Sequence, residues 1–218
     1  MRILSRSVFV LLALLASTLP VFAQRGMFHS PDMQGVWNPV VGAGGTYEIQ
    51  KASGEKSQLD IFIAGKETVD GKDGYWIEMV MQDSKRGGQF VMKTLSVYDG
   101  SSLDMSKVVI QLPGQNPMEM PMQMSGGQSK RNIDIKSNGQ VVGTETVTTP
   151  AGTFSAEHWR SNEGGDVWIS SKAPPYGLVK SVNKDGDSMT LVKRITDAPD
   201  RITGTPQPFN PMNMAPKQ

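Results

Sequence analysis

Methionine supplies the most unusual side-chain chemistry of this sequence. The chain has 14 methionines, and four of them, Met118, Met120, Met122 and Met124, occupy alternate positions. Alternate side chains of a strand point to one face, so a strand over residues 118–124 would align four thioethers. Soft thioethers suit Cu(I), whereas methionine also fills apolar cores and adaptable binding surfaces. Three interpretations stay open: a Cu(I) site, the lining of an apolar site, and ordinary packing of a core or lid.

Neither of the two histidines has a local catalytic partner. His29 lies near the N-terminus, and His158 directly follows Glu157. Neighbouring residues on a strand point to opposite faces, so Glu157 and His158 cannot act together as an acid–base pair. A general base could still assemble from distant residues, because histidine titrates near neutral pH. The simpler interpretation is a histidine at the surface or core edge, held by a hydrogen bond.

The usual catalytic and cofactor motifs are absent. The chain has no cysteine, no His-Glu-x-x-His, no Gly-x-Ser-x-Gly and no phosphate loop that ends in Gly-Lys-Ser/Thr. The glycine-rich residues 42–45 lead into a predicted strand, whereas a phosphate loop needs a helix N-terminus there. We therefore predict that the protein is not an enzyme and has no catalytic residue, no metal ligand and no cofactor.

Methionine and tryptophan together define the predicted ligand site. In the predicted strand over residues 75–82, Met79 and Met81 share an apolar face with Tyr75 and Ile77. Large aromatic rings could line a cavity, although burying each one in an ordinary core also stabilises the fold by about 1.5–3 kcal/mol. The residues predicted to line an apolar site are Met79, Met81, Met118, Met120, Met122, Met124, Trp76 and Trp168.

Turn residues recur too often for long helices. From Gly100 onward, turn glycines recur 9 to 14 residues apart, a spacing typical of antiparallel sandwiches, barrels and curved meanders. They lie at positions 100, 114, 126–127, 139, 152, 164–165, 177 and 186. The predicted strands include residues 35–41, 118–124 and 131–136. We predict a mainly β fold over residues 35–197: a single curved antiparallel sheet, as a half-barrel or open barrel in meander order, with little helix.

Two proline–glycine corners lie in residues 149–180. Pro150 with Gly152, and Pro175 with Gly177, match the positions that proline and glycine prefer in type I turns. These corners frame a predicted hairpin that carries Trp168, and the second corner leads back into the sheet. We interpret the segment as an architectural feature.

The termini predict an exported protein. Residues 1–23 combine Arg2 and Arg6 with a nine-residue apolar run and a small-residue cleavage site near Ala23, which is typical of a secretory signal peptide. That run is too short to span a bilayer, which takes about 20 residues, and we predict no transmembrane segment. Residues 24–34 are predicted as a flexible lead-in and residues 198–218 as a proline-rich tail. We expect the mature protein to be periplasmic or secreted.

The charge balance argues against nucleic acid as a partner. Loss of Arg2 and Arg6 with the leader leaves 20 basic and 21 acidic residues, a net charge of −1 with histidine neutral. No basic field is then available to attract nucleic acid or anionic lipid surfaces. An apolar small molecule or lipid is the expected partner, and the sequence identifies no protein partner.

Several motifs resemble one family of exported bacterial proteins. They are residues 74–78, 117–121, 149–154, 166–170 and 175–180. Over about residues 35–203 the chain is similar to a family of unknown function related to the LolA/LolB-like lipoprotein-carrier half-barrels. The resemblance implies a strongly bent antiparallel sheet whose concave side is apolar and can receive a lipid or acyl chain. Unlike those carriers, this chain has no convincing helices to cover that side.

The sequence therefore leaves three functional hypotheses. The first is a soluble periplasmic binding or carrier protein for an apolar ligand such as a lipid or acyl chain. The second is an extracytoplasmic Cu(I)-binding protein that uses the methionine strand. The third is a structural accessory module of a cell-envelope complex, which would expose an apolar patch to a fixed partner.

Overall fold

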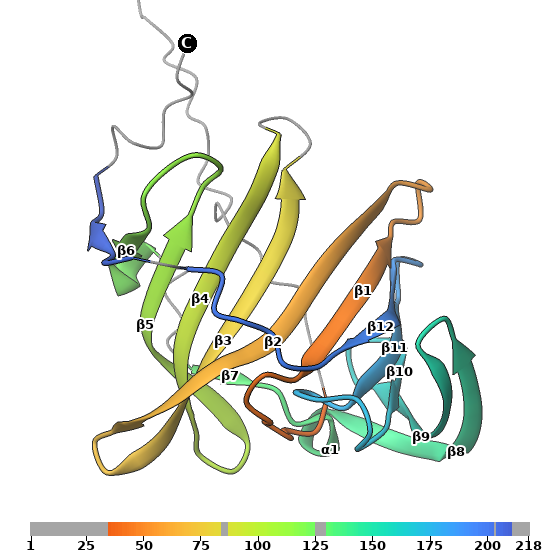
Figure 1. The fold of residues 1–218 in the computed structure, drawn as a ribbon. Helices are drawn as coiled ribbons and strands as arrows, with labels where there is room; N and C mark the ends of the chain where they lie inside the picture. The colour runs from red at the N-terminus through yellow and green to blue at the C-terminus, as the bar shows by residue number, and fades with distance from the viewer. Residues whose placement is uncertain (1–34, 84–86, 125–129, 203, 211–218) are drawn as a thin grey trace, which may run out of the picture.

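The computed structural model describes residues 35–83, 87–124, 130–202 and 204–210, and its main feature is one large sheet (Figure 1). The strands of the first half are β1 (Gly44–Gln50), β2 (Lys56–Val69), β3 (Lys72–Asp83), β4 (Gly88–Tyr98), β5 (Ser102–Gln111), β6 (Met118–Met120) and β7 (Lys130–Asn132). Those of the second half are β8 (Gly139–Thr149), β9 (Gly152–Ser161), β10 (Gly165–Ile169), β11 (Leu178–Asn183), β12 (Ser188–Ile195) and β13 (Gln207–Pro208). The helices are a short 3-10 turn, η1 (Met122–Met124), and α1 (Ile135–Asn138).

The sheet consists of two meanders joined by one strand pair. Strands β1 to β6 neighbour one another in chain order, strands β8 to β12 do the same, and β1 pairs with β12 in antiparallel register. The described strands do not close into a ring, because β8 lies at one end of the order and β13 at the other. The prediction of a single curved, open, antiparallel sheet with little helix is confirmed. The short parallel pair between β13 and β6 is an exception to the antiparallel order.

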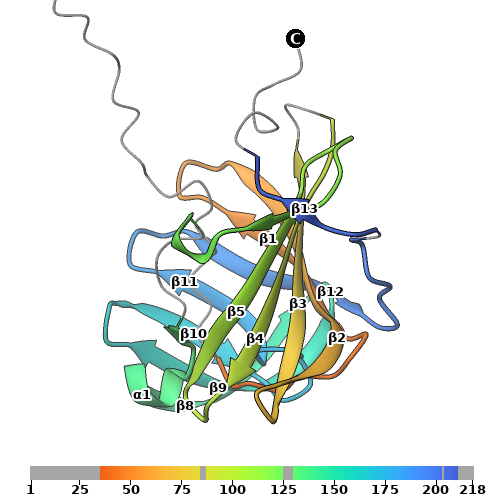
Figure 2. The ribbon, with the colours of Figure 1, turned by 90° about the vertical axis from the view of Figure 1, so that its left-hand side faces the viewer.

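Apolar side chains line one face of the first meander, which we call the inner face. The register sets Ile61, Met79, Met92, Ile110 and Met118 opposite one another across β2 to β6, and all five are buried. Figure 2 shows that β3, β4 and β5 run almost at right angles to β9, β10 and β11. The sheet therefore bends so that its two halves face each other.

The second meander covers the inner face of the first. The same buried cluster contains Trp159, Val167, Leu178 and Leu191, which come from β9 to β12. Side chains that fully leave water contribute about 1.5–3 kcal/mol each, so this mutual burial is the main source of stability. A helical lid is unnecessary, because the sheet covers itself.

Aromatic residues close one end of the space between the halves. The segment before β1 donates Val36 N–H to the Tyr176 carbonyl at 2.8 Å. This places the Trp37 ring 5.7 Å from Tyr75, in an edge-on arrangement, and 5.5 Å from Tyr176. The segment predicted as a strand over residues 35–41 is instead an irregular plug with isolated bridges at its two ends.

A C-terminal strap, residues 198–202 and 204–210, crosses the opposite, outer face of the first meander. In Figure 1 it runs in dark blue from β12 across β2 to β4 and reaches β6. Ile202 packs there against Phe62, Val80 and Val109. Gln207 lies between two prolines but keeps an N–H, which it donates to the Pro117 carbonyl at 2.9 Å where the strap pairs with β6 as β13.

Two other predicted strands are shorter than expected. The strand predicted over residues 118–124 ends at Met120, because Pro121 lacks an N–H and the next residues form η1. The strand predicted over residues 131–136 ends at Asn132, and α1 begins soon after, where the Asp134 carboxylate accepts the Lys136 N–H at 3.0 Å.

Some predictions lie outside the described residues. These are the signal peptide over residues 1–23, the lead-in over residues 24–34 and the last part of the tail, residues 211–218. Within the residues that the structure describes, no helix is long and apolar enough to span a bilayer.

The start of β1 gives a test of the close strand packing. A Cβ at Gly44 would overlap the Ile61 carbonyl oxygen and lie 2.5 Å from Phe62 Cα, whereas a Cβ at Gly65 would meet only Trp76, at 3.8 Å. We predict that Gly44→Ala lowers the free energy of unfolding by about 3 kcal/mol, because the β1–β2 backbones must move apart. The matched variant Gly65→Ala should change it by less than about 1 kcal/mol. Urea unfolding followed by tryptophan fluorescence would measure both, and equal effects would contradict the explanation.

Candidate functional site

The predicted methionine site is divided among different environments. Met79, Met118 and Met120 are buried in the core between the two halves of the sheet. Met122 is partly buried against this core, whereas Met81 and Met124 are 38% and 51% exposed. The structure thus brings three of the six predicted methionines together, as tightly packed core residues.

The end of β6 at Met120 also separates the four thioethers of the run 118–124. Met118 and Met120 keep the expected common face, but η1 redirects the chain after Pro121. The geometric premise of the Cu(I) hypothesis, one strand with four aligned thioethers, is therefore wrong. The described residues also contain no group of three or more His, Cys, Asp or Glu side chains placed to hold a metal ion.

The two predicted tryptophans lie far apart in the sheet order. Trp76 is on β3, where Lys93 lies 5.0 Å from its ring centre and Glu67 accepts its Nε1–H at 2.9 Å. Trp168 is on β10, and Lys180 lies 5.1 Å from its ring centre. The structure does not join them into one site.

A different site lies where β11 and β12 separate. These strands pair only from Lys180 to Val182 on the β11 side, so the preceding β11 backbone and the last part of β12 are not paired with each other. The buried Tyr47 hydroxyl fills part of this gap and donates to the Leu178 carbonyl at 3.1 Å. Burial raises the pKa of Tyr47 well above its usual range, so the hydroxyl remains a donor at physiological pH.

The separation leaves a hollow of about 620 Å³, which we call the corner hollow. Its wall contains apolar parts of β12 and of both proline corners, and its rim carries three exposed cations. The lining residues are Ala43, Gly44, Pro150, Ala151, Lys172, Pro174, Val192, Lys193, Arg194, Ile195 and Thr196. No carboxylate is among them.

Three cations line the corner hollow, but Lys193 and Arg194 are neighbours on β12 and point to opposite faces of the strand, so one of these two can meet a ligand together with Lys172. Among the described residues, none makes an ion pair with Lys172, Lys193 or Arg194. Sequence reasoning missed this site because Lys172 is distant in sequence from Lys193 and Arg194, and these two look like ordinary surface charges. The only signal was the pair of proline corners, which we interpreted as architecture and which the fold brings to one rim.

A second hollow, the edge hollow, lies between β6 and the strap. It measures about 510 Å³ and is lined by Glu119, Met120, Pro121, Pro206, Pro208 and Phe209. Met120 is the one predicted site residue that lines either hollow. The edge hollow has a carboxylate and no cation, so its charge is opposite to that of the corner hollow.

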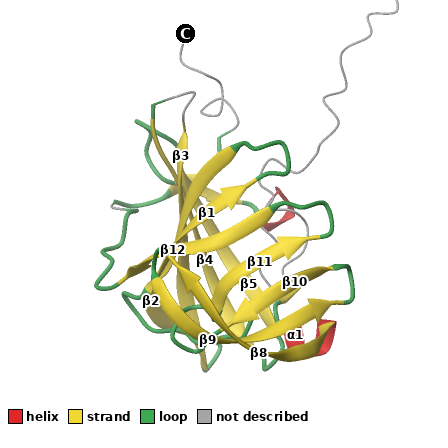
Figure 3. Ribbon diagram, turned by 90° about the vertical axis from the view of Figure 1, so that its right-hand side faces the viewer, coloured by secondary structure: helices red, strands yellow, loops and turns green. Residues whose placement is uncertain are grey.

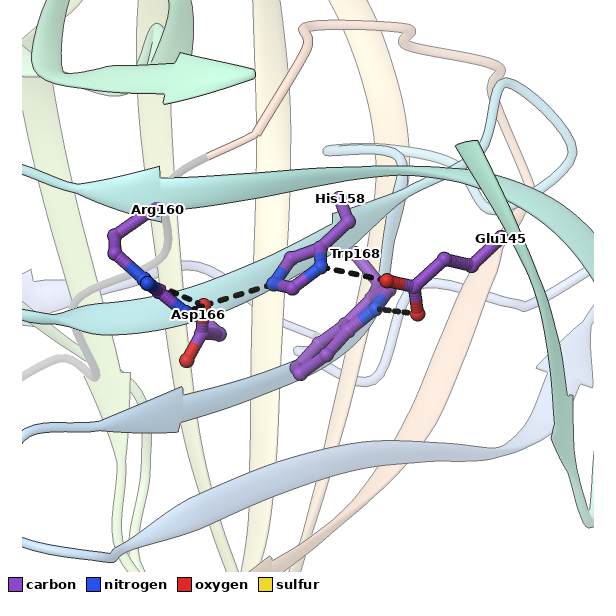
Figure 4. A network of polar contacts seen from close by, with 5 residues as sticks. All are labelled: Glu145, His158, Arg160, Asp166 and Trp168. Carbon is purple, nitrogen blue, oxygen red and sulfur yellow. Dashed lines mark hydrogen bonds and ion pairs between the residues drawn. The ribbon is translucent and has the colours of Figure 1, made fainter. Parts of the chain in front are cut away.

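His158 lies in a polar network on β8 to β10 (Figure 4). Its Nδ1 is 2.8 Å from Glu145 Oε1, and its Nε2 is 2.8 Å from Asp166 Oδ1. The imidazole stacks on Trp168 with ring centres 4.4 Å apart, and Trp168 Nε1–H donates to Glu145 Oε2 at 3.0 Å. Arg160 also donates to Asp166 Oδ1, at 3.0 Å. The network thus ties three neighbouring strands together.

The hydrogen bonds of this network hold three neighbouring strands together. Both imidazole nitrogens face carboxylates, which only accept hydrogen bonds, so both contacts are satisfied when each nitrogen carries hydrogen. Hydrogen bonds from Trp168 and His158 lower the pKa of Glu145, and the hydrogen bond from His158 lowers the pKa of Asp166. The expectation of a histidine held by hydrogen bonds matches this geometry, although the partners come from other strands.

A buried carboxyl group holds the strap. Glu78 on β3 is fully buried, its Oε2 accepts the Arg201 N–H at 3.0 Å, and Lys93 Nζ lies 3.7 Å from its Oε1. Lys93 also pairs with Asp200 of the strap. Burial, followed by a hydrogen bond with Asp200, raises the pKa of Glu78 to about 7. Burial opposes ionisation of Asp200 as well, but hydrogen bonds with Glu78 and Lys93 outweigh it and lower the Asp200 pKa.

Comparisons with known proteins identify only distant structural neighbours. No protein-family model matches the chain, and no curated protein matches it in sequence. A candidate lipoprotein from Parabacteroides distasonis is 15% identical with a TM-score of 0.38, and the match covers 74% of this chain and 99% of that one. A candidate exported protein with a YmcC-like fold from Bacteroides fragilis is 16% identical with a TM-score of 0.37, at the same coverage.

A larger neighbour is found in the complex of MucA and MucB from Pseudomonas aeruginosa. It is 13% identical with a TM-score of 0.43, and the match covers 75% of this chain and 55% of that one. At such identities and TM-scores no functional argument follows from any of these neighbours. The resemblance to the LolA/LolB-like carriers therefore stays a prediction about function.

The raised pKa of Glu78 predicts a pH dependence of stability. Because the folded-state pKa of about 7 exceeds the ordinary value of 4.5, this contribution is complete below pH 4.5 and is lost as the pH rises through 7. We predict that, through Glu78, the unfolding free energy of the wild type falls by about 2–3 kcal/mol between about pH 5 and about pH 8. Glu78→Gln, which imitates the neutral acid, should not show this part of the fall. Urea unfolding of both proteins at the two pH values would measure this difference.

The exposed acid Glu163 provides the control for that measurement. It lies in the turn between β9 and β10, so Glu163→Gln should keep the wild-type pH dependence. A Glu78→Gln variant with the same slope as the wild type would show that Glu78 does not bind its proton more tightly in the folded state.

Proposed function

We propose that this protein is an extracytoplasmic binding protein for an amphiphilic anion, such as an acyl chain with a carboxylate head, held in the corner hollow. The observation that carries the proposal is the apolar wall of that hollow beside the cations Lys172, Lys193 and Arg194, none of which forms an ion pair within the described part of the chain. The predicted signal peptide supports the compartment. The proposal keeps the lipid class of ligand inferred from the sequence but moves the site away from the methionine run.

The size and chemistry of the hollow support this ligand class. Its volume of about 620 Å³ falls within the usual range for small-molecule sites, about 300–1,000 Å³. Pro150, Pro174, Val192 and Ile195 offer apolar contact for a hydrocarbon chain. A carboxylate at the rim would gain charge-assisted hydrogen bonds from the cations, which are roughly twice as strong as neutral ones. An uncharged chain of the same length would lack this gain.

Binding of matched ligands to matched variants would test the proposal. We predict saturable binding of dodecanoate, and about tenfold weaker binding of it to Lys193→Gln/Arg194→Gln, because the variant loses the β12 cation that faces the carboxylate. Binding of 1-dodecanol should be weak and nearly unchanged. Isothermal titration calorimetry below the micelle concentration would measure both ligands.

Lys184→Gln provides the control, since Lys184 is exposed in the turn after β11, is paired with Asp185 and does not line the hollow. This variant should bind dodecanoate as the wild type does. If the wild type binds neither ligand, or if the double variant retains full affinity for dodecanoate, the proposed function is wrong.

A further inference from the structure

The edge strands at the two ends of the sheet differ in how far other parts of the described chain cover them. At one end, the strap covers β6 and brings Pro206 and Pro208 to the border, and prolines cannot donate the hydrogen bonds that another strand would need. At the other end, β8 pairs with β9 on one side only. Among the described residues, no strand pairs with the outer side of β8.

The sequence of β8 suits pairing with another strand. Its eleven residues include no proline, lysine or arginine, which are the usual means of blocking an exposed strand edge. Most of its side chains are exposed, including Val141 at 58% and Val142 at 52%. Valine and threonine dominate the strand, and both favour extended backbone.

The one charged side chain of β8 is hydrogen-bonded within the same chain. The Glu145 carboxylate bonds to His158 Nδ1 and Trp168 Nε1, so it lies over β9 and β10 rather than outward beyond the edge (Figure 4). An approaching strand therefore meets an edge whose one carboxylate already has hydrogen-bond partners. The network around His158 thus keeps the Glu145 side chain away from the outer side of this edge.

A bulge limits the part of β8 that can pair regularly. The register with β9 shifts between Val141 and Gly143, whereas Gly143 to Thr149 continue without interruption. This regular segment of β8 is centred on Thr146. It offers an uninterrupted row of outward backbone groups to a partner.

We propose that the regular segment of β8 is a self-association edge, through which a second copy of this chain pairs in antiparallel register about a two-fold axis at Thr146. Thr146 then faces its own equivalent, Thr144 faces the partner's Thr148, and Glu145 faces the partner's Val147. Threonine pairs and the absence of facing like charges favour this register. A two-fold interface requires one patch to complement itself, and this segment does so.

Size-exclusion chromatography with light scattering across a protein concentration series would test the proposal. The wild type should form a dimer with rising concentration. Thr146→Lys and Thr146→Glu should each weaken the dimer about tenfold or more, because two like charges would face each other at the axis. An equimolar mixture of the two variants should recover association, because the introduced ammonium and carboxylate groups then attract each other across the axis.

Controls make each outcome decisive. Val40→Lys changes an exposed valine of the plug before β1, outside the edge, and should dimerise as the wild type does. Circular dichroism would check that the variants fold. A wild type that stays monomeric, a dimer that Thr146→Lys leaves intact, or a mixture that fails to associate would each overturn the proposed pairing. The dodecanoate titration can succeed or fail independently, since it reports on the corner hollow.

Discussion

Mutual burial of the two halves of one sheet is the interaction on which this structure depends. The inner face of β2 to β6 carries an unbroken apolar row, and no helix of the described chain is available to cover it. The pairing of β1 with β12 joins the second meander to the first and lets it turn over that face. Methionine suits such a core, because its flexible thioether adapts to two layers of strands that cross at a steep angle (Figure 3).

The sites proposed here arise where this sheet cannot continue. The corner hollow lies beside the last part of β12, which is not paired with β11, and is bordered by the two proline corners. Because the sheet is open, it also has two borders, the edge strands at the two ends of the strand order. The strap covers one border, whereas no strand of the described chain pairs with the outer side of β8 at the other. The core between the two halves of the sheet therefore stabilises the fold, and the places where strand pairing stops provide the proposed binding surfaces.

Two buried polar groups show how the outer face is organised. Glu78 has a fully buried carboxyl group, and the strap supplies most of what surrounds it, including a backbone N–H and the Asp200 carboxylate. His158 instead finds both of its partners on neighbouring strands of its own meander. The first group links distant parts of the chain, and the second links adjacent strands. Both positions follow from the need of buried polar atoms for hydrogen bonds.

The sequence by itself determined the class of fold, because turn spacing and the alternation of apolar residues are local properties that a meander preserves. It also limited the chemistry, through the lack of cysteine and of familiar catalytic motifs. The local sequence pattern did not predict the methionine site correctly. The methionine strand ends early at Met120, before Pro121. The crossing of the two halves of the sheet buries Met79 and Met118 as core residues. The partners of His158 lie 8 and 13 residues away, on the other strands of the β9–β10 and β8–β9 hairpins. Only the tertiary structure could bring both proline corners, Lys172 and the end of β12 to one hollow, because their closeness depends on how far the whole sheet bends.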